Sequence, residues 1–556
     1  MQLLDWIVLS LTLFFIVGYG VWKTRGSSTV QDYIKGGSTA QWWTIGLSVM
    51  ATQASAITFL STPGQAFHDG MGFVQFYFGL PIAMVIICMV FIPIYHRLKV
   101  YTAYEYLESR FDQRTRTLTA LLFLTQRGLA AGITIYAPAI ILSAVLGWDL
   151  TTLNIIIGIL VVIYTVSGGT KAVSVTQKQQ MGVIFAGMFI AFFLILSYLP
   201  QGIDFKESML IAGANEKLNV LDFGFDFDNR YTFWSGLIGG TFLALSYFGT
   251  DQSQVQRYLS GKNVREMRLG LIFNGLLKVP MQFFILLVGV MVFIFYQFNS
   301  APLNFNPAGE QAVKTSAYQA EYVNLENQLH TLEDQKKSLT LSIAQNEPSK
   351  RVLDELAQVN KEEAQLRTQA KELIHLADED IETNDKDYVF IHFILNNLPN
   401  GLIGLLLAVI LCAAMSSTAS ELNALAATTT VDLYKRNKEG REDQHYVQAT
   451  RWFTLLWGAI AITIACTARL FDNLIQLVNI IGSVFYGNIL GIFLLAFFVR
   501  YVKQRAVFMA ALITQCIVIY GYFADWMPYL WLNLFGCALV MLIAVLLQKI
   551  SPQTTS

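Results

Sequence analysis

The sequence has 556 residues, of which 54% are hydrophobic and only 14% are charged, and its formal net charge is -1. Soluble proteins average roughly 25% charged residues, so this composition predicts a protein built for lipid. The near-neutral charge argues against a nucleic-acid binder and against a basic protein held at a membrane surface. The five cysteines all lie in apolar stretches without a CxxC pair, so we interpret them as packing residues.

Apolar stretches long enough to cross a bilayer recur along the chain. A transmembrane helix needs roughly 20 apolar residues, and about 13 such segments are present. They lie near residues 3–22, 40–66, 71–96, 117–146, 151–168, 174–199, 231–257, 270–298, 399–433, 447–469, 473–499, 506–523 and 527–548. The first has no basic residues before it and no small-residue cleavage pattern after it, so we expect a retained helix and not a signal peptide.

Lysine and arginine alternate between the loops on the two sides of these segments. The basic loops lie near residues 23–35, 97–116, 171–178, 257–268, 435–441 and 500–505, and the loops between them are nearly bare. Basic loops face the cytoplasm. The pattern therefore predicts a multi-pass protein of the plasma (inner) membrane with its N-terminus outside and its C-terminus in the cytoplasm.

The one long hydrophilic stretch, about 300–386, falls on the outer side. Its apolar residues recur at coiled-coil spacing on either side of a breaker at 346–349. This predicts a hairpin of two antiparallel helices of about 25 residues each, projecting on the order of 35–40 Å from the membrane. Two interpretations stay open for residues 311–378: a tolerated insertion that a short linker could replace, and a docking arm for an envelope partner.

Two spans contain dense polar sequence, at 48–58 and at 246–254. Backbone groups in lipid must be paired, so polar residues and glycines packed into an apolar span indicate a discontinuous helix that lines a cavity. The two spans lie five helices apart, which suits two inverted five-helix repeats. Polar helix-helix contacts are the alternative explanation.

A third polar cluster, at 413–423, includes Ser416 and Ser417. A sodium ion is hard and is bound by several oxygens, which hydroxyls and carbonyls at a helix break supply without added charge. A Ser-Ser pair alone is weak support, because such hydroxyls often bond to carbonyls one turn earlier in the helix.

Four stretches now make the sequence recognisable: Ala413 to Arg436, Ser167 to Val173, Gln254 to Arg257, and the pair Pro63 and Gly64. They resemble the solute:sodium symporter family, which includes sodium-coupled carriers of glucose, proline, iodide, pantothenate and sialic acid. The resemblance runs from about residue 5 to 550 and excludes the hairpin. It implies an all-α polytopic membrane protein with the five-plus-five inverted repeat of the leucine transporter, extra helices and an extracytoplasmic helical hairpin.

Carried over by position, the resemblance implies one set of residues for sodium and another for the solute. The sodium ligands are the carbonyls of Ala51, Ala54 and Ala413 and the hydroxyls of Ser416 and Ser417. The solute-binding residues are Gln53, Ser55, Thr58, Tyr77, Arg127, Tyr247, Lys278 and Gln476. Tyr247 matches an aromatic gate below the substrate.

Arg127 and Lys278 are intramembrane cations, which are costly and therefore functional candidates. An arginine that faces the cavity could bind a carboxylate through two hydrogen bonds, which favours an anionic solute. The alternatives for Arg127 are an internal pair with Asp251 or Glu421, and snorkelling to the membrane surface.

Two positions depart from the family. Gln177 stands where many members have an aspartate that helps form a second sodium site, and Ala419 stands where a liganding serine would be. These departures predict one sodium per solute. Glu421 is unexpected in this helix, and we expect it to pair with Lys178 because a buried carboxylate without a counter-charge tends to take up a proton.

Together these features predict a sodium-coupled secondary symporter that imports a sugar, a sugar acid or another carboxylate by alternating access. Its expected partners are this small solute and the lipid bilayer, and we expect no nucleic acid. A proton-coupled carrier or a solute exchanger is the alternative. An enzyme is not expected, because no HExxH or GxSxG motif stands at a membrane face. A sensor would need a long cytoplasmic domain after the last span, and we expect none.

The chain divides into five predicted parts. They are a leading helix and loop at 1–36, the first repeat and the start of the second at 37–299, the hairpin at 300–386, the rest of the second repeat at 387–500, and two further helices with a short tail at 501–556.

Overall fold

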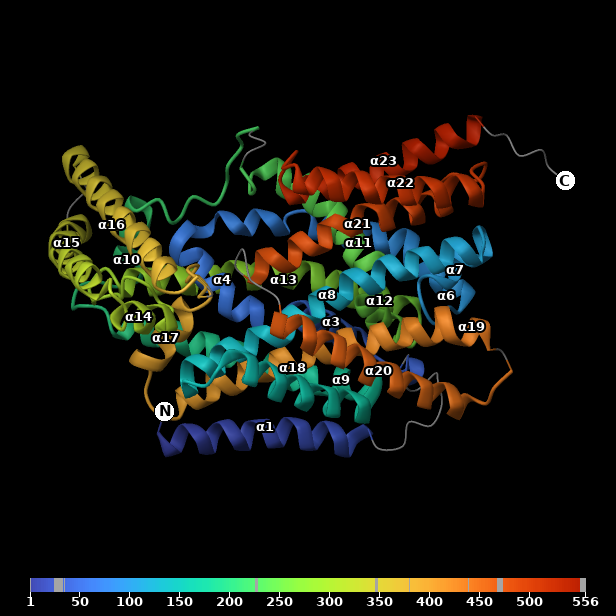
Figure 1. The fold of residues 1–556 in the computed structure, drawn as a ribbon, viewed down its shortest axis with the longest axis horizontal. Helices are drawn as coiled ribbons and strands as arrows, with labels where there is room; N and C mark the ends of the chain where they lie inside the picture. Colours follow the sequence, from blue (N-terminus) through green and yellow to red (C-terminus); the bar gives the residue numbers. More distant parts are fainter. Residues whose placement is uncertain are drawn as a thin grey trace.

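The computed structural model describes residues 2–24, 34, 36–225, 229–345, 349–379, 381–438, 440–467 and 474–550. All named elements among them are helices, as expected where lipid cannot satisfy backbone polar groups. Figure 1 shows the long helices running roughly along one direction, with the hairpin at one end of the bundle.

The helices of the first half follow the chain from α1 to α12. They are α1 (Leu3–Thr24), η1 (Gly36–Ser38), α3 (Trp42–Gln53), α4 (Ala56–Asp69), η2 (Gly70–Tyr77), α5 (Leu80–Ile86), η3 (Ile87–Phe91), α6 (Ile92–Leu98), α7 (Glu105–Arg110), α8 (Gln113–Leu146), α9 (Leu150–Ser197), α10 (Phe205–Ala214), η4 (Ser235–Gly239), α11 (Gly240–Gly249) and α12 (Gln252–Leu259).

The second half contains the hairpin and the remaining long helices. They are α13 (Val264–Phe295), α14 (Pro307–Lys314), α15 (Gln319–Gln345), α16 (Lys350–Ala377), α17 (Val389–Asn397), α18 (Leu402–Thr428), η5 (Thr429–Tyr434), α19 (Lys435–Asn437), α20 (Asp443–Thr467), α21 (Leu474–Phe498), α22 (Gln504–Phe523) and α23 (Tyr529–Ile550).

Within the described residues, nine helices are long and apolar enough to cross a membrane. Three shorter apolar helices, Leu3–Phe15, Leu150–Ile163 and Ser235–Gly249, fall in other predicted spans. Helix occupies each of the predicted spans.

Helix α9 covers two predicted spans in one 48-residue element. Asn154 near its start donates to the Ala465 carbonyl at the end of α20. Gly187 near its end packs against Leu406 at the start of α18. Thr429, just after α18, bonds to Trp457 in the middle of α20, so the chain turns back after α19 and the two helices run antiparallel. The start of α18 and the end of α20 therefore lie at the same end of the bundle. A straight helix of this length would measure roughly 72 Å, so the two halves of α9 must run in opposite directions, as the two predicted spans require.

Two spans are interrupted in the middle. Helix α3 ends at Gln53 and α4 begins at Ala56, and α11 ends at Gly249 and α12 begins at Gln252. These are the two spans in which the sequence predicted discontinuous helices. The interruptions place non-helical backbone inside the protein, where it can be paired without contact with lipid.

Helix α1 is fixed to the start of α18 by Asp5. This fully buried carboxylate accepts hydrogen bonds from the amides of Gly401 at 2.6 Å and Gly404 at 3.2 Å. It thereby satisfies amide groups at a helix N-terminus. Helix α1 begins at the hairpin end of the bundle and α23 ends at the opposite end (Figure 1).

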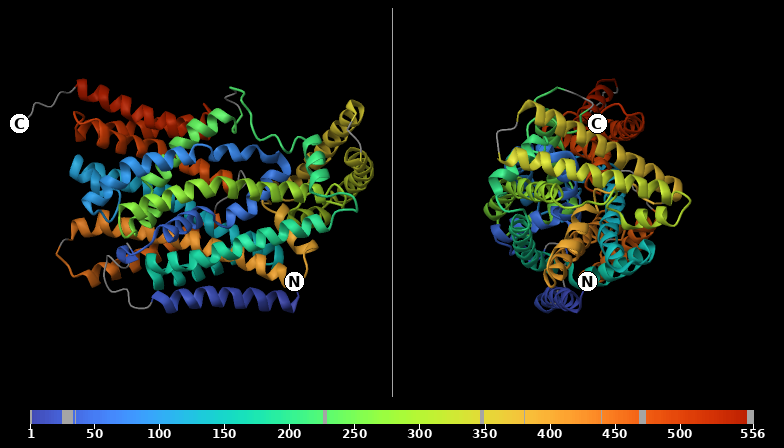
Figure 2. Two further views of the ribbon diagram at one scale, coloured as in Figure 1. Left: turned by 180° about the vertical axis from the view of Figure 1, so that it is seen from behind. Right: turned by 90° about the vertical axis from the view of Figure 1, so that its left-hand side faces the viewer.

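The hairpin consists of α15 and α16, as its coiled-coil spacing predicted. The Ser349 hydroxyl caps α16, and residues 346–348 of the predicted breaker lie outside the described part of the chain. Ile343 and Leu356 belong to the main hydrophobic core, and Asn360 bonds to Asn215 after α10. Figure 2 shows the hairpin lying across the end of the bundle. The predicted projection of the hairpin away from the membrane is therefore wrong, because its apolar face packs back onto the protein.

Candidate functional site

The first interruption provides backbone oxygen atoms inside the bundle. Ala54 and Ser55 separate α3 from α4, and Ser55 has an extended backbone with φ -77° and ψ 177°. The last turn of a helix retains carbonyls without intrahelical partners. The carbonyls of Ala51 and Ala54 lie at this interruption, and both residues are buried. Such oxygens suit a hard cation.

The second interruption differs because protein side chains already satisfy its carbonyls. The Tyr95 hydroxyl donates to the Gly249 carbonyl at 2.8 Å, and the Tyr104 hydroxyl donates to the Thr250 carbonyl at 2.9 Å. Asp251 caps the start of α12 by accepting from the Ser253 amide. The first interruption is therefore the better place for a cation.

Two hydroxyls of α18 complete the predicted sodium set. Ser416 and Ser417 are each 1% exposed. The Ser417 hydroxyl contacts the carbonyls of Ala413 and Ala414, both at 3.1 Å. The Ser416 hydroxyl has no hydrogen-bond partner in the described residues. Leaving a buried hydroxyl unpaired costs roughly 1–3 kcal/mol, so Ser416 is a candidate ligand position.

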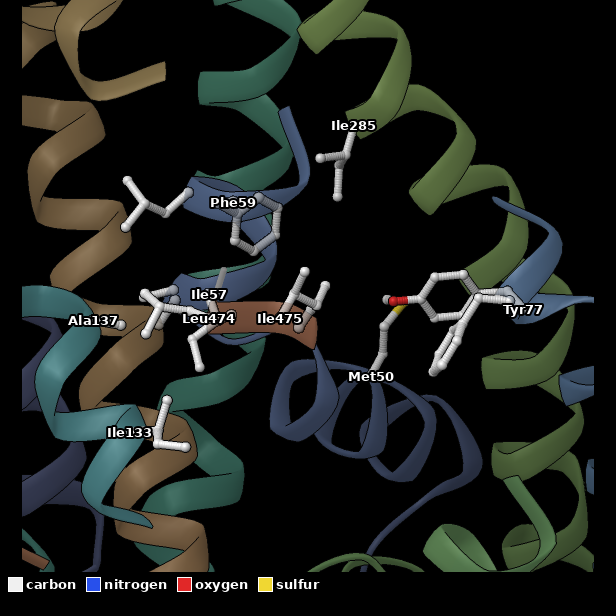
Figure 3. Packing of buried hydrophobic residues seen from close by; sticks show 14 of the residues in the cluster. Met50, Ile57, Phe59, Tyr77, Ile133, Ala137, Ile285, Leu474 and Ile475 are labelled. Carbon is white, nitrogen blue, oxygen red and sulfur yellow. The ribbon is translucent and has the colours of Figure 1, made fainter. Parts of the chain in front are cut away.

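A cavity of about 80 Å³ lies beside the first interruption. The predicted solute residues that line it are Gln53, Ser55, Thr58, Tyr77, Arg127 and Tyr247. Ser417 of the predicted sodium set also lines it. Figure 3 shows Tyr77 pointing toward Met50, with Ile57 and Ile475 on the far side of the gap.

Arg127 lies at the centre of a buried ionic cluster that joins four helices. Its guanidinium pairs with Asp251 at the start of α12 and with Glu421 on α18, the second pair at 3.1 Å. It also donates to the Tyr486 hydroxyl of α21 at 2.7 Å. The Tyr247 ring lies 5.3 Å from its central carbon. Both terminal nitrogens are thus engaged by protein groups, which is the internal pairing that the sequence left open.

The expected pairing of Glu421 with Lys178 is wrong. Glu421 accepts from Arg127 and, through its second oxygen, from the Thr134 hydroxyl at 2.8 Å. Lys178 instead lies near the Thr44 hydroxyl and 4.5 Å from the Trp43 ring centroid. The spacing of charges along α9 and α18 does not reveal that α8 brings a nearer guanidinium.

Lys278 does not line the cavity, but it lies behind one wall. It is fully buried on α13, with its ammonium nitrogen 5.5 Å from the Tyr77 ring centroid. That nitrogen has no hydrogen-bond partner in the part of the chain that the structure describes. Burying an unpaired charge is costly, so Lys278 favours an anion nearby.

Gln476 also lies outside the cavity lining. Its side-chain carbonyl accepts from Arg230 at 2.6 Å, and its amide donates to Gln65 of α4 at 3.2 Å. Gln65 in turn donates to Asp69, which pairs with Lys386 at 2.6 Å. In this conformation Gln476 is part of a polar network that closes the cavity toward the hairpin end.

A second polar network closes the opposite end. Arg116 of α8 pairs with Asp432 of η5 and with Glu108 of α7, both at 2.7 Å. Thr102 donates to the same Asp432 oxygen, and Arg436 pairs with Glu108. The small cavity thus lies between two polar networks, one toward each end of the bundle.

Gln177, for which the sequence resemblance implied an aspartate in many members of the family, lies on α9 and is fully buried. Its carbonyl accepts from Ser48 at 2.5 Å, and its amide donates to Thr52 at 3.1 Å and Ser420 at 3.3 Å. A neutral amide group therefore bonds to three hydroxyls, two on α3 and one on α18. An amide nitrogen donates hydrogen bonds and cannot ligate a cation.

Sequence reasoning did not single out Thr134, Asn479 and Tyr486, although all three line the cavity. Each stands in a long apolar helix that is not interrupted near it. Only the helix faces that meet at the cavity identify them.

The sequence and the fold are both similar to those of known membrane transporters. The profile of the Sodium:solute symporter family matches residues 33–343 and 376–514, and the unmatched stretch 344–375 lies in the hairpin. The chain is 32% identical over 301 residues to the human sodium/iodide cotransporter, which covers 52% of this chain and 45% of that protein. It therefore spans about half the length of that relative.

Two further likenesses extend over most of the chain. A sodium-coupled monocarboxylate transporter 1 of Xenopus laevis is 27% identical over 503 residues, covering 90% of this chain and 68% of that protein. A solved structure of a Na⁺-coupled sialic acid symporter, substrate-bound and outward-open, has a TM-score of 0.77 at 22% identity and covers 99% of this chain and 98% of that chain. This likeness confirms the predicted fold, and the relatives are transporters and not enzymes. The chain belongs to the sodium:solute symporter family.

Proposed function

We propose that this protein is a sodium-coupled symporter that imports a small organic anion, with a short-chain monocarboxylate as the best fit. The observation that carries the sodium assignment is the Ser416 hydroxyl, which is buried without a hydrogen-bond partner among the described residues on α18, a helix that packs against α3 and α4. Sodium is held by the carbonyls of Ala51, Ala54 and Ala413 and the hydroxyls of Ser416 and Ser417. Neutral oxygens of this kind suit a monovalent hard cation.

The sodium site adjoins the solute cavity, which supports coupling. Ser417 lines the cavity together with Thr52, Gln53 and Ser55 from the interruption. An ion that fixes the interrupted backbone also fixes these walls of the cavity. Binding of sodium thereby lowers the cost of ordering the solute site, which is positive coupling between the two ligands.

Lys278 supports an anionic solute. It is the buried cation beside the cavity that has no hydrogen-bond partner among the described residues, and its ammonium nitrogen lies 5.5 Å from the ring centroid of Tyr77, which lines the cavity. Arg127 is less suited to this role, since Asp251 and Glu421 already engage both of its terminal nitrogens. A solute carboxylate that reaches Lys278 relieves the cost of a buried unpaired charge.

The relatives and the cavity size agree with this solute class. The names of the relatives give iodide, monocarboxylates and sialic acid as their solutes, and all three are anions. The cavity of about 80 Å³ favours a small anion over a sugar acid. A neutral sugar or a larger sugar acid would require the walls to move apart.

The direction of transport follows from the basic loops. With those loops in the cytoplasm, the hairpin end faces outward, the N-terminus lies outside and the C-terminus lies inside. The sodium gradient across a plasma membrane then drives the solute inward.

The decisive experiment measures uptake of radiolabelled propionate into proteoliposomes, with sodium or choline outside. We expect sodium-dependent uptake that Ser416→Ala weakens and that Lys278→Gln reduces strongly. Lys262→Gln, which changes an exposed lysine of a cytoplasmic loop, is the matched control and should leave uptake unchanged.

Three outcomes would contradict the proposal. Uptake driven by a proton gradient without sodium would identify a proton-coupled carrier. Sodium-independent counterflow would identify an exchanger. Sodium-dependent uptake of glucose but not of propionate or iodide would keep the coupling and overturn the anionic solute.

A further inference from the structure

Three consecutive residues at the foot of the hairpin, Asp385, Lys386 and Asp387, contact three different parts of the transporter. We call residues 385–387 the strap. Asp385 is 1% exposed, and its carboxylate pairs with Lys371 of α16 at 3.0 Å and lies 3.8 Å from the His68 side chain of α4. The strap therefore begins with a contact between the hairpin and the interrupted helix.

Lys386 binds the same helix at two points. Its ammonium pairs with Asp69 at 2.6 Å. Its carbonyl lies so close to Gly64 that a Cβ atom added there would be 1.7 Å from the carbonyl oxygen. Backbone contact of this closeness is open only to glycine. The strap and α4 are thus packed together without intervening side chains.

Asp387 extends the strap to α21. It is 4% exposed, and its carboxylate accepts from the Leu474 amide, the first residue of α21, at 3.0 Å. A carboxylate at the start of a helix is also favoured by the helix dipole. The three strap residues therefore connect α16, α4 and α21.

Helices α4 and α21 are neighbouring walls of the solute cavity, and they contact each other directly. Thr58 of α4 and Asn479 of α21 both line it. The Gln65–Gln476 bond joins the same two helices closer to the strap. For a solute to enter from the hairpin end these walls must separate. That movement breaks the Lys386 contacts to α4 or the Asp387 contact to α21.

We infer that the strap is the outer latch of the transporter, and that the hairpin sets the rate of outward opening through the Lys371–Asp385 pair. This inference rests on the proposed alternating-access function and adds a role for the hairpin. Asp385, Lys386 and Asp387 are positioning residues, since they act on the cavity through α4 and α21. The hairpin is then more than a dispensable insertion, because removing it takes away the counter-charge of a buried carboxylate.

The test uses the full chain in intact cells and reports on the cavity directly. Asn479→Cys places a reporter thiol in the cavity wall, and a membrane-impermeant thiol reagent is added outside. The same chain without the reporter gives the background from the native cysteines. The labelling rate measures how often the cavity opens outward, and a purely structural role of the hairpin would not change it in protein that folds normally.

Lys371→Met should raise the labelling rate about threefold or more, because it removes the ionic contact that holds the strap in place. Lys371→Arg keeps the charge and should return the rate toward that of the parent. Asp385→Asn keeps an acceptor for the Phe305 amide but loses the charge, so it should act in the same direction as Lys371→Met. Lys361→Met changes an exposed lysine of the same helix and is the matched control.

Equal labelling rates for Lys371→Met, Asp385→Asn and Lys361→Met would overturn the inference while leaving the transport function intact. A reporter that is never labelled from outside in any variant, with or without sodium, would instead contradict alternating access itself. A higher rate in the two strap variants alone supports the latch.

Discussion

Arg127 and Glu421 meet at the centre of the bundle, where the guanidinium nitrogen lies 3.1 Å from the carboxylate oxygen. Asp251 pairs with the other terminal nitrogen, so two buried carboxylates share one guanidinium. Removing the cation leaves both carboxylates without a counter-charge, whereas removing one carboxylate leaves a matched pair. The two changes should therefore differ greatly in their effect on stability.

We predict that Arg127→Met lowers the free energy of unfolding by roughly 3–5 kcal/mol, the usual cost of breaking a buried ion pair. Glu421→Gln should cost far less, because Arg127 keeps Asp251 and the new amide can still accept from Thr134. Thermal unfolding in detergent measures both changes. Arg351→Met, which breaks an exposed hairpin pair with Glu355, is the control and should have almost no effect. Equal losses in the two core variants would mean that Arg127 is not the shared counter-charge of the two carboxylates.

Replacing a predicted sodium-binding serine by alanine should raise half-saturating sodium, whereas replacing another helix hydroxyl should not. Ser416→Ala removes a hydroxyl that has no protein partner in the described residues, so we expect little loss of stability and a rise of about tenfold in half-saturating sodium, equivalent to about 1.4 kcal/mol. Ser417→Ala should raise it similarly and also cost roughly 1 kcal/mol of stability for the lost hydrogen bond.

Thr463→Ala provides the control for this series. Thr463 is exposed on α20, and its hydroxyl donates to the Ala459 carbonyl one turn earlier. Sodium titration of the uptake rate compares the three variants. If half-saturating sodium is unchanged in both serine variants, the ion is bound elsewhere.

Much of the architecture is predictable from sequence because each element is determined locally. Hydropathy defines the spans, and polar density marks the two interruptions. Heptad spacing defines α15 and α16. The orientation of the hairpin is not local, since it depends on which surface Ile343 and Leu356 cover. The heptad pattern requires an apolar partner but does not identify it.

Part of the candidate site was predictable because its residues could be matched by sequence position to those of the similar family. Gln53, Ser55, Thr58 and Tyr77 meet at one cavity. The partners of charged residues were harder, because long-range pairs depend on how helices cross. Sequence spacing suggested Lys178 for Glu421, but α8 brings Arg127 closer. The strap likewise has no sequence motif, and only its contacts with α4, α16 and α21 identify it.

Lys217 should show unusual reactivity in the wide cleft of about 950 Å³ beneath the hairpin. Burial lowers the pKa of its ammonium to about 8, and the nearby Lys336 acts in the same direction while Asp69 opposes it. Only the neutral amine attacks an acylating reagent, so the labelling rate should rise with pH, reach half of its maximum near pH 8 and level off above about pH 9. Mass spectrometry of the Lys217 peptide between pH 6.5 and about 10 measures this. A rate that keeps rising above pH 9.5 would show that the amine is not buried as described.

The last prediction concerns the number of sodium ions. Gln177 binds three hydroxyls with a neutral amide, at a position where the sequence resemblance implied a carboxylate in many members of the family. A second sodium there would lack a negative ligand and would face an amide donor. We therefore predict one sodium per solute. With a monovalent anion this coupling moves no net charge, so transport should be electroneutral and should reach only about tenfold accumulation for a tenfold sodium gradient.

Gln177→Asp should restore the carboxylate and create a second cation site with Ser48, Thr52 and Ser420 as neutral ligands. Each cycle would then carry one positive charge, and at 100 mV with a tenfold gradient the driving force would rise to about 5.1 kcal/mol, or roughly 4,000-fold accumulation. Gln177→Asn shortens the amide without adding charge and should remain electroneutral. Current and isotope flux recorded together in proteoliposomes give the charge moved per solute. A parent protein that already moves one net charge with a monovalent anion would show that a second sodium binds despite Gln177, and Glu421, which lies beside Ser420 on α18, would then be the carboxylate to test as its ligand.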